Sequence, residues 1–307
     1  MKTYRANGKL LLTGDYLVLQ GAKALALPLR LGQTMQSDVL EIKNGIIHWD
    51  AMTTKGLWFT AMIDKHDFSV RCSDDISKAE TLSNIFRVLK TLNPGILEED
   101  NDYAFTTRLE ADSQWGLGSS STLISLLSQW AGVDPYQVLR ETFGGSGYDI
   151  ACATASKPII YQVTDNNPIV KDTDFCPTFI DNLYFVYQGH KQFSGKEVKS
   201  FKERARVSDF SKEKREISEI TETIVSGTTF EDFCSLLDRH EEIISRCIGR
   251  KPLKTNYPDF HGTIKSLGAW GGDFFLAATE MPYKEVSNYF NKRRFDVIFK
   301  YKDLFIK

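Results

Sequence analysis

The chain has 307 residues, of which 42% are hydrophobic and 12% aromatic, enough apolar material for one large core or two cores of ordinary size. Its formal net charge is −2, with acidic and basic residues interspersed, so neither a nucleic-acid surface nor a membrane surface is indicated and small molecules are the expected partners. No apolar run approaches the roughly 20 residues of a membrane span, and no signal-type segment follows the first residues. We therefore expect a cytoplasmic protein.

The cysteines and histidines do not form a recognisable metal or disulfide framework. The five cysteines are scattered and contain no Cys-x-x-Cys pair, and the five histidines have no ligand spacing. These patterns favour reduced thiols and argue against a structural transition metal.

The first hundred residues predict strands followed by a helix. Residues 4–12 read as a strand that leads into Gly14-Asp15, and a weakly alternating pattern between 31 and 70, with Asn44-Gly45 as a hairpin signal, predicts further antiparallel strands. From Ile76 to Leu92 apolar residues recur every three or four positions, and Asn93-Pro94-Gly95 follows. That spacing predicts an amphipathic helix over 76–92.

The stretch from Gly116 to Ser121 reads Gly-Leu-Gly-Ser-Ser-Ser, follows a predicted strand over 103–109 and precedes an apolar run that ends near Gly132. Glycines let the backbone approach a ligand, and the first turn of a helix offers free N–H groups and the positive end of its dipole. Strand, glycine turn and apolar helix are the order that a phosphate site needs. The alternative is an ordinary helix capped by Ser119 or Ser120.

A second flexible turn lies between Gly144 and Gly147, after a short helix predicted over 136–143 behind the cap Asp134-Pro135. It opens on Tyr148-Asp149, and Asp149 is the one acid in an otherwise uncharged stretch. Asp149 is therefore a candidate catalytic base, with a helix N-cap as the alternative.

The second half of the chain reads as a mixture of strands and charged helices, and the pattern lapses around 172–177, where we place a boundary between two lobes. In the loop after a strand over 183–187, Lys191 and Lys196 are either contacts for an anionic substrate or solvated lysines. The other expected elements are a strand over 159–163, a turn over 165–168, helices over 197–225 and 229–248, a further helix over 258–267 and a strand over 274–278.

Three glycine-bearing segments stand out together: Gly8-Lys9 with Gly14-Asp15, Gly116–Ser121, and Gly268–Gly272. In order and spacing they resemble the three motifs of the GHMP kinases, the family of galactokinase, homoserine kinase, mevalonate kinase and phosphomevalonate kinase. The middle motif is the most specific, and the outer two are most similar to the mevalonate and phosphomevalonate kinases. The resemblance covers essentially the whole chain.

The resemblance implies an α+β, two-lobe GHMP-kinase fold. Residues 1–175 would form an N-terminal, ATP-binding lobe like domain 2 of ribosomal protein S5, and residues 176–307 a C-terminal, ferredoxin-like α/β-sandwich lobe. The implied activity is ATP-dependent phosphorylation of a mevalonate-like or phosphomevalonate-like acceptor, with ATP and Mg²⁺ as cofactors. Phosphoryl transfer asks the protein mainly for positioning and charge neutralisation, which suits these residue types.

The roles implied by the resemblance are carried over residue by residue. Asp149 and Lys9 would be catalytic, and Ser120 would ligate Mg²⁺, with Glu141 as a weaker second candidate because its spacing from Asp149 is shorter than in the family. ATP would be bound by Gly116, Leu117, Gly118, Ser119, Ser120 and Ser121. The acceptor would be bound by Asp15, Ser146, Gly147, Trp270, Gly271 and Gly272.

This sequence also departs from the family pattern. Asn7 stands where proline is usual, Ser121 where alanine is usual and Trp270 where a small residue is usual, and an indole there would change the volume of an acceptor pocket. Two other functions stay open: an enzyme like diphosphomevalonate decarboxylase, or a nucleotide-binding protein without turnover. We expect a monomer or a homodimer.

Overall fold

The computed structural model describes residues 1–98, 100–165, 167–190 and 194–306, without the side chains of Ser194 and Lys196. Lys191 and the side chain of Lys196, named above as possible substrate contacts, lie outside this part of the chain. The contacts divide the chain into two compact units, the first comprising Met1–Gly8, Leu31–Ser113 and Leu117–Thr154, and the second Lys9–Arg30, Gln114–Gly116 and Ala155–Lys307. The predicted lobe boundary between 175 and 176 stays a prediction.

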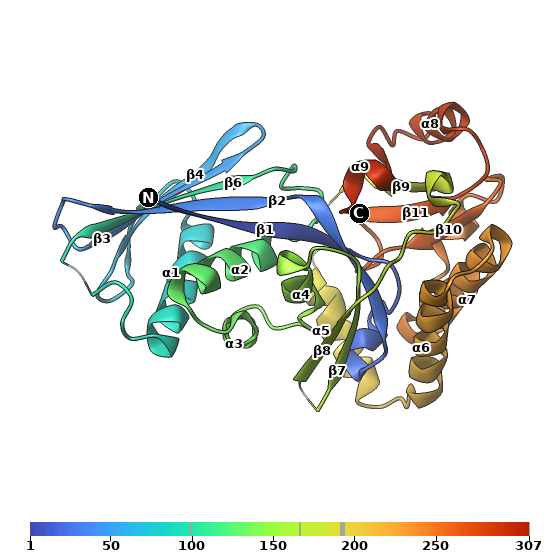
Figure 1. Ribbon diagram of the computed structural model, residues 1–307, viewed down its shortest axis with the longest axis horizontal. Helices are drawn as coiled ribbons and strands as arrows, with labels where there is room; N and C mark the ends of the chain where they lie inside the picture. The colour runs from blue at the N-terminus through green and yellow to red at the C-terminus, as the bar shows by residue number, and fades with distance from the viewer. Residues whose placement is uncertain (99, 166, 191–193, 307) are drawn as a thin grey trace. The chain divides into compact units, whose positions relative to one another are not determined.

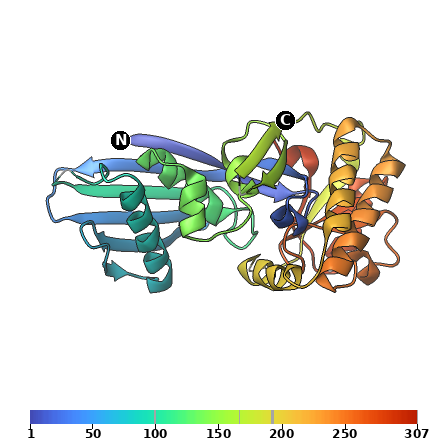
Figure 2. The same cartoon turned by 90° about the horizontal axis from the view of Figure 1, so that it is seen from below.

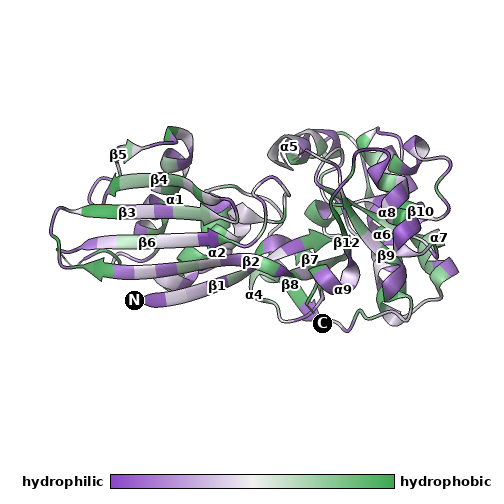
Figure 3. Cartoon of the chain, turned by 90° about the horizontal axis from the view of Figure 1, so that it is seen from above, coloured by the Kyte–Doolittle hydropathy of each residue, from purple (hydrophilic) through white to green (hydrophobic). Residues whose placement is uncertain are grey.

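The first unit is built on a sheet in which the strands lie in the order β5-β4-β3-β6-β2, with β1 paired to β2. β1 and β2 are long enough to contribute residues to both units. The pairing of β3 with β6 is parallel, whereas β2 with β6, β3 with β4 and β4 with β5 are antiparallel. Figure 3 shows β4, β3, β6 and β2 side by side. The bounds are β1 Lys2–Leu11, β2 Ala24–Leu40, β3 Ile46–Thr53, β4 Gly56–Asp64, β5 Val70–Ser73 and β6 Asp102–Leu109.

Helix α1 spans Ile76–Leu92, as its apolar spacing predicts, and covers one face of this sheet together with α2 (Figures 1 and 2). Asp75 caps its start by accepting a hydrogen bond from the backbone N–H of Lys78 at 3.1 Å. Alternate residues of β3 point to the helices, and the aromatic rings of Trp49 and Phe86 meet there with their centroids 6.2 Å apart. The amphipathic helix thus buries its apolar face on the sheet.

The turn at Asn44-Gly45 does not join a hairpin, so that prediction is wrong. It connects β2 to β3, but β6 lies between these two strands in the sheet. The carboxylate of Asp102, at the start of β6, accepts hydrogen bonds from the N–H groups of Asn44 and Ile46 at 2.8 and 3.1 Å. Because the turn is anchored on a third strand, its two flanking strands are held apart, and β3 runs parallel to β6 instead.

Three helices complete the first unit: α2 (Ser119–Ala131), α3 (Pro135–Glu141) and α4 (Tyr148–Thr154). Asp134 caps α3 and Pro135 is its first residue, as predicted. Helix α2 packs against both α3 and α4.

The second unit contains a sheet in the order β10-β11-β9-β12, in which all neighbours are antiparallel. Strand and helix alternate as β9, helices, β10, β11, α8, β12, which is the β-α-β-β-α-β pattern of ferredoxin-like domains. The strands are β9 Leu183–Tyr187, β10 Thr263–Ser266, β11 Phe274–Ala278 and β12 Ile298–Lys300, and the helices are α5 Ser194–Ala205, α6 Ser211–Ser226, α7 Phe230–Ile248, α8 Tyr283–Asn291 and α9 Tyr301–Leu304.

The remaining elements of the second unit form contacts between segments that are far apart in the sequence. The first residues of β2 pair with β7 (Ile159–Thr164), which pairs with β8 (Asn167–Asp172). Leu29 of β2 also forms a bridge to Phe305, and the Arg30 side chain donates to the carbonyl of Phe305 at 2.9 Å. Short 3₁₀ turns lie at Leu17–Gln20, Ile180–Asn182 and Leu253–Asn256.

Two predictions in this unit are wrong. The helix expected over 258–267 is replaced by β10, because Thr263 to Ser266 pair along the edge of β11. The single helix expected over 197–225 is two helices, α5 and α6, which are interrupted between Ala205 and Ser211. Within the residues that the structure describes, none of the helices combines the length and apolar character needed to cross a membrane.

Candidate functional site

The start of α2 has the features of an anion-binding helix terminus. Gly118 is the N-cap residue, with φ 104° and ψ 29°, a left-handed conformation that suits glycine. Ser121 is buried, and its hydroxyl donates back to the carbonyl of Gly118 at 2.8 Å, whereas Ser120 is exposed. No acidic residue lies in the first turn, so no side chain there offsets the positive end of the helix dipole.

These observations place the predicted nucleotide residues on one short segment, where Leu117 is buried and Ser119 half-buried. The first N–H groups of an α-helix have no partners within the helix, and a phosphate group can accept hydrogen bonds from them. Ser120 presents its hydroxyl at the same helix start. Mg²⁺ bound with a nucleotide usually takes only one or two protein ligands, and a single hydroxyl fits that arrangement.

Asp149 lies in the first turn of α4, one residue after its start, and not at the N-cap position. One carboxylate oxygen accepts the N–H of Ile150 at 3.0 Å, and the side chain is half-buried. Ser146 and Gly147 lead directly into this helix, and the N–H of Ala151 donates to the carbonyl of Gly147 at 3.1 Å. Because α4 packs against α2, the predicted base Asp149 and the predicted nucleotide residues Ser119 to Ser121 lie on neighbouring helices of the same unit.

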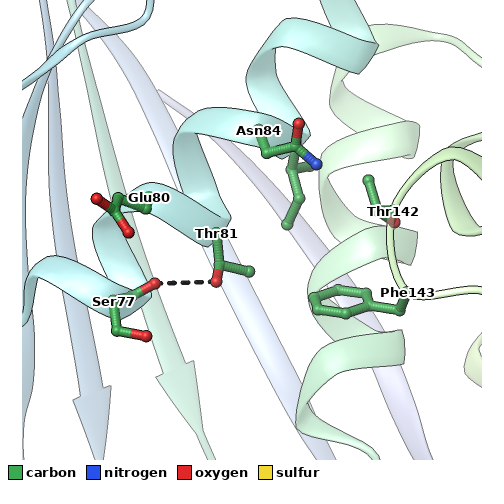
Figure 4. Close-up of a pocket in the computed structure, with 7 residues that line it drawn as sticks. Ser77, Glu80, Thr81, Asn84, Thr142 and Phe143 are labelled. Atoms are coloured by element: carbon green, nitrogen blue, oxygen red, sulfur yellow. Dashed lines mark hydrogen bonds between the residues drawn. The ribbon is translucent and has the colours of Figure 1, made fainter. Parts of the chain in front are cut away.

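Glu141 is the last residue of α3 and is exposed. Directly after it, Thr142 and Phe143 face α1 across a pocket of about 380 Å³ (Figure 4). The lining contains one acid, Glu80, and no basic residue, so this pocket does not suit a phosphorylated ligand. It also contains none of the predicted site residues. Among the residues described, no three His, Cys, Asp or Glu side chains come together as a metal site.

The first motif contributes a half-buried Lys9 on β1 and a fully buried Asp15. One carboxylate oxygen of Asp15 accepts a hydrogen bond from the ammonium of Lys265 at 2.5 Å, and the other accepts the N–H of Gly268 at 2.6 Å. Lys265 is fully buried as well. Burial raises the pKa of the Asp15 carboxyl, and Lys265 and the Gly268 N–H oppose that rise. The first motif is thereby bonded to the third.

Two residues of α7 extend this buried cluster. The Nε2 atom of His240 accepts the N–H of Gly14 at 2.8 Å, and burial together with Lys265 lowers the pKa of His240 well below its usual value. The imidazole is therefore neutral, with its proton on Nδ1. Glu241 accepts the N–H of Ser266 at 3.1 Å, and burial raises its pKa to about 7.

The loop of the third motif is fixed through its backbone. The N–H of Trp270 donates to the hydroxyl of Tyr16 at 3.0 Å, and its carbonyl accepts from Arg250 at 2.6 Å. The carbonyl of Gly271 contacts the ring of His190, and that of Gly272 accepts from the amide of Gln188 at 2.7 Å. Trp270 is only 3% exposed, so this departure from the family pattern fills interior space.

Sequence reasoning missed Lys265, His240 and Glu241, although signals for them existed. Lys265 is the only charge in the short strand β10. His240 and Glu241 continue the spacing of Phe233 and Leu237 along the buried face of α7, where apolar residues are the rule. A polar residue at a core position of a helix requires a partner, and here the partners come from the first and third motifs.

Neither a family model nor a curated protein sequence matches the chain. Its structure, in contrast, is similar to solved structures over almost its whole length. The phosphomevalonate kinase of Streptococcus pneumoniae, solved in complex with phosphomevalonate and AMPPNP, has a TM-score of 0.69 and 15% identity, covering 98% of this chain and 100% of that one. The mevalonate kinase of Methanococcus jannaschii has a TM-score of 0.63 and 15% identity, covering 100% and 98%.

The galactokinase of Lactococcus lactis, complexed with galactose, has a TM-score of 0.63 and 12% identity, covering 94% of this chain and 87% of that one. These structural neighbours are GHMP kinases of different substrate specificity. The predicted α+β fold of the GHMP kinases is confirmed.

Proposed function

We propose that this chain, which has the fold of the GHMP kinases, is an ATP-dependent kinase that phosphorylates a small anionic acceptor resembling mevalonate or phosphomevalonate. The observation that carries the proposal is the start of α2, where a left-handed glycine is followed by exposed Ser120 and by no acid. A helix terminus of this kind binds phosphate groups. Because the sequence identity to these neighbours is low, the acceptor has to be identified by experiment.

In the proposed reaction ATP supplies the phosphoryl group and Mg²⁺ neutralises its charge when bound. The backbone N–H groups between Gly116 and Ser121 hold the phosphates, and Ser120 ligates the metal ion, with Glu141 as a second candidate ligand. Lys9 neutralises charge that develops on the transferring group. None of these roles requires a covalent intermediate on the protein.

Where the acceptor reacts through a hydroxyl, Asp149 orients that hydroxyl and accepts its proton, while ADP leaves from the transferred phosphoryl group. Its place in the first turn of α4 favours an ionised carboxylate, because the helix dipole is positive there. The proposed acceptor contacts are Ser146 and Gly147 before α4 and Trp270 to Gly272 in the third motif. Asp15, whose two carboxylate oxygens are both bonded within the protein, is proposed to act indirectly by holding the third motif in place.

A screen of small alcohols and phosphomonoesters for ATP-dependent turnover tests the proposal. Phosphorus NMR of the products separates the outcomes: a phosphoester or a diphosphate supports a kinase, whereas free phosphate with loss of CO₂ indicates a decarboxylase. No turnover with any acceptor, despite nucleotide binding, would identify a nucleotide-binding protein without activity.

Asp149→Asn tests the mechanism. The amide keeps the shape of the side chain and removes its charge and basicity, so turnover should fall by about 10²-fold or more, while the melting temperature and AMPPNP affinity stay unchanged. Asp134→Asn is the matched control, because Asp134 caps α3 in the same unit and asparagine caps equally well. An Asp149→Asn protein that unfolds but keeps full activity per folded molecule would show that Asp149 has a structural role only.

A further inference from the structure

The side chain of Arg250 links the loop of the third motif to two helices of the same unit. Its Nη1 atom donates to the carbonyl of Trp270 at 2.6 Å, and its Nη2 atom donates to the carboxylate of Glu197, in α5, at 2.8 Å. The main chain of Arg250 is fixed just after α7, because its N–H donates to the carbonyl of Ser245 at 3.1 Å and its own carbonyl accepts the Ser245 hydroxyl. The guanidinium thus joins the loop to α5 and to the end of α7.

This link depends on the shape of the guanidinium. The group is planar and carries its donors in a fixed fork, so it can bond a carbonyl and a carboxylate at the same time, whereas the ammonium of lysine is a single point of charge. The bond from Arg250 to the Trp270 carbonyl is also charge-assisted, unlike the bond from the Trp270 N–H to the neutral hydroxyl of Tyr16. Of these two bonds to the main chain of Trp270, the bond from Arg250 is therefore the stronger.

The indole of Trp270 makes no polar contact in its buried position. Trp270 is 3% exposed, and among the residues that the structure describes none accepts a hydrogen bond from its Nε1–H. A buried donor without a partner is costly, because the hydration it had in the unfolded chain is not replaced. Gly268 and Gly271 in the same loop have positive φ values of 64° and 106°, so the loop backbone has wide conformational freedom of its own. The bonds to the main chain of Trp270, together with the burial of its apolar ring, must offset this cost.

We propose that Arg250 is a positioning residue that keeps Trp270 in the interior and thereby sets the room that the third motif leaves for the acceptor. Without the guanidinium the loop loses its link to α5, and the indole can turn outward, where water satisfies its N–H. The part of the inference that concerns the acceptor rests on the function proposed above, in which the third motif contacts the acceptor. The part that concerns the position of Trp270 does not.

Acrylamide quenching of tryptophan fluorescence tests the position of Trp270. Arg250→Met removes both bonds of the guanidinium and keeps an apolar stem, so quenching should rise. The chain has five tryptophans, and a rise that comes from Trp270 should be absent when Arg250→Met is made in a Trp270→Phe background. Arg293→Met is the matched control, because Arg293 also bonds a carboxylate, that of Asp259 at 2.8 Å, and a backbone carbonyl, that of Tyr289 at 3.1 Å, in the same unit. It should leave quenching unchanged.

The quenching results separate a positioning role from general loosening of the fold. Equal quenching in the native protein and in folded Arg250→Met would overturn the inference. A rise that persists in the Trp270→Phe background, or that Arg293→Met produces as well, would also overturn it. Arg250→Lys, which keeps the charge but cannot span both partners, replaces the methionine variant should that one fail to fold, and a smaller rise in quenching is then expected.

Steady-state kinetics with mevalonate and phosphomevalonate as acceptors test the consequence for the proposed reaction. In Arg250→Met the KM for the acceptor that reacts should rise by about tenfold or more, while kcat and the KM for ATP stay within about twofold. A lower kcat with an unchanged acceptor KM would overturn the role assigned to Arg250. If neither compound reacts with the native protein, the proposed acceptor class fails and the acceptor part of this inference fails with it, whereas quenching still decides the position of Trp270.

Discussion

Two predicted residues of the first unit and one of the second lie in opposite environments. In the first unit Ser120 is exposed and Asp149 is half-buried, each in the first turn of a helix. In the second unit Asp15 has no exposed surface and bonds to Lys265, which was not predicted and is buried as well. Removing one partner of a buried charge pair strongly lowers stability, whereas exchanging an exposed polar side chain usually has a small effect. The glycine motif of the first unit is therefore open to a ligand, as the proposed function requires, whereas the first motif holds the loop of the third motif in place.

The largest effect is expected from Lys265→Met, which removes one partner of the buried pair. Asp15 would be left as an uncompensated charge, and the free energy of unfolding should fall by about 3–5 kcal/mol. Chemical denaturation measures the change. Lys302→Met is the matched control, because Lys302 pairs with Asp181 and both side chains are more than half exposed, at 51% and 71%. A loss of under 1 kcal/mol is expected for the control. An equally small loss for Lys265→Met would show that the buried pair contributes no more to stability than an exposed pair.

A pH-dependent effect is expected from Glu241, which packs beside Lys265, Asp15 and neutral His240. Its folded-state pKa of about 7 exceeds the ordinary value of 4.5, so the folded protein holds this proton more tightly than the unfolded chain does. The stabilisation is present below pH 4.5 and is lost as the pH rises through 7, amounting to about 3 kcal/mol. Glu241→Gln cannot titrate.

The difference in unfolding free energy between the native protein and Glu241→Gln, followed across this pH range, isolates the contribution of Glu241 from those of Asp15 and His240. The native protein should lose stability relative to the variant as the pH rises. A difference that does not change with pH would mean that the buried cluster holds Glu241 in one protonation state throughout.

The smallest effect concerns the two ends of α2. Gly118 and Gly132 both have left-handed φ values, 104° and 66°, and cap the two ends of the same helix. Valine is strained at either position, but only Gly118→Val should also misplace the N–H groups that face the phosphates. AMPPNP with Mg²⁺ at a hundredfold excess over its dissociation constant should stabilise the native protein and Gly132→Val by about 2.7 kcal/mol, and Gly118→Val not at all. Equal thermal shifts in the two variants would remove the phosphate-binding role of this helix start.

The fold was predictable where local signals agree. Helix α1 has both an apolar repeat and a capping Asp75, and its bounds agree with the prediction. The Asn44-Gly45 turn failed as a hairpin signal because Asp102, which anchors it, lies 58 residues from Asn44. Such a contact leaves no local trace in the sequence.

The candidate site also contains residues that local signals predict and residues that only the fold brings together. The glycines and hydroxyls around Gly118 form one continuous motif, so their place at a helix start was predictable. The pairing of Asp15 with Lys265 joins residues 250 positions apart, and neither residue specifies the other. Only the fold brings them together, and for this reason the burial of Asp15 could not be predicted from a motif that resembles a turn.

The bridge between Leu29 and Phe305 has a consequence for the newly made chain. Arg30 donates to the carbonyl of Phe305 across 275 positions, and Leu29 is fully buried beside it. At 5–20 residues per second, a ribosome needs on the order of tens of seconds to make the intervening chain. During that time Leu29 lacks this partner, so this part of β2 can complete its pairing only after residue 305 has been made.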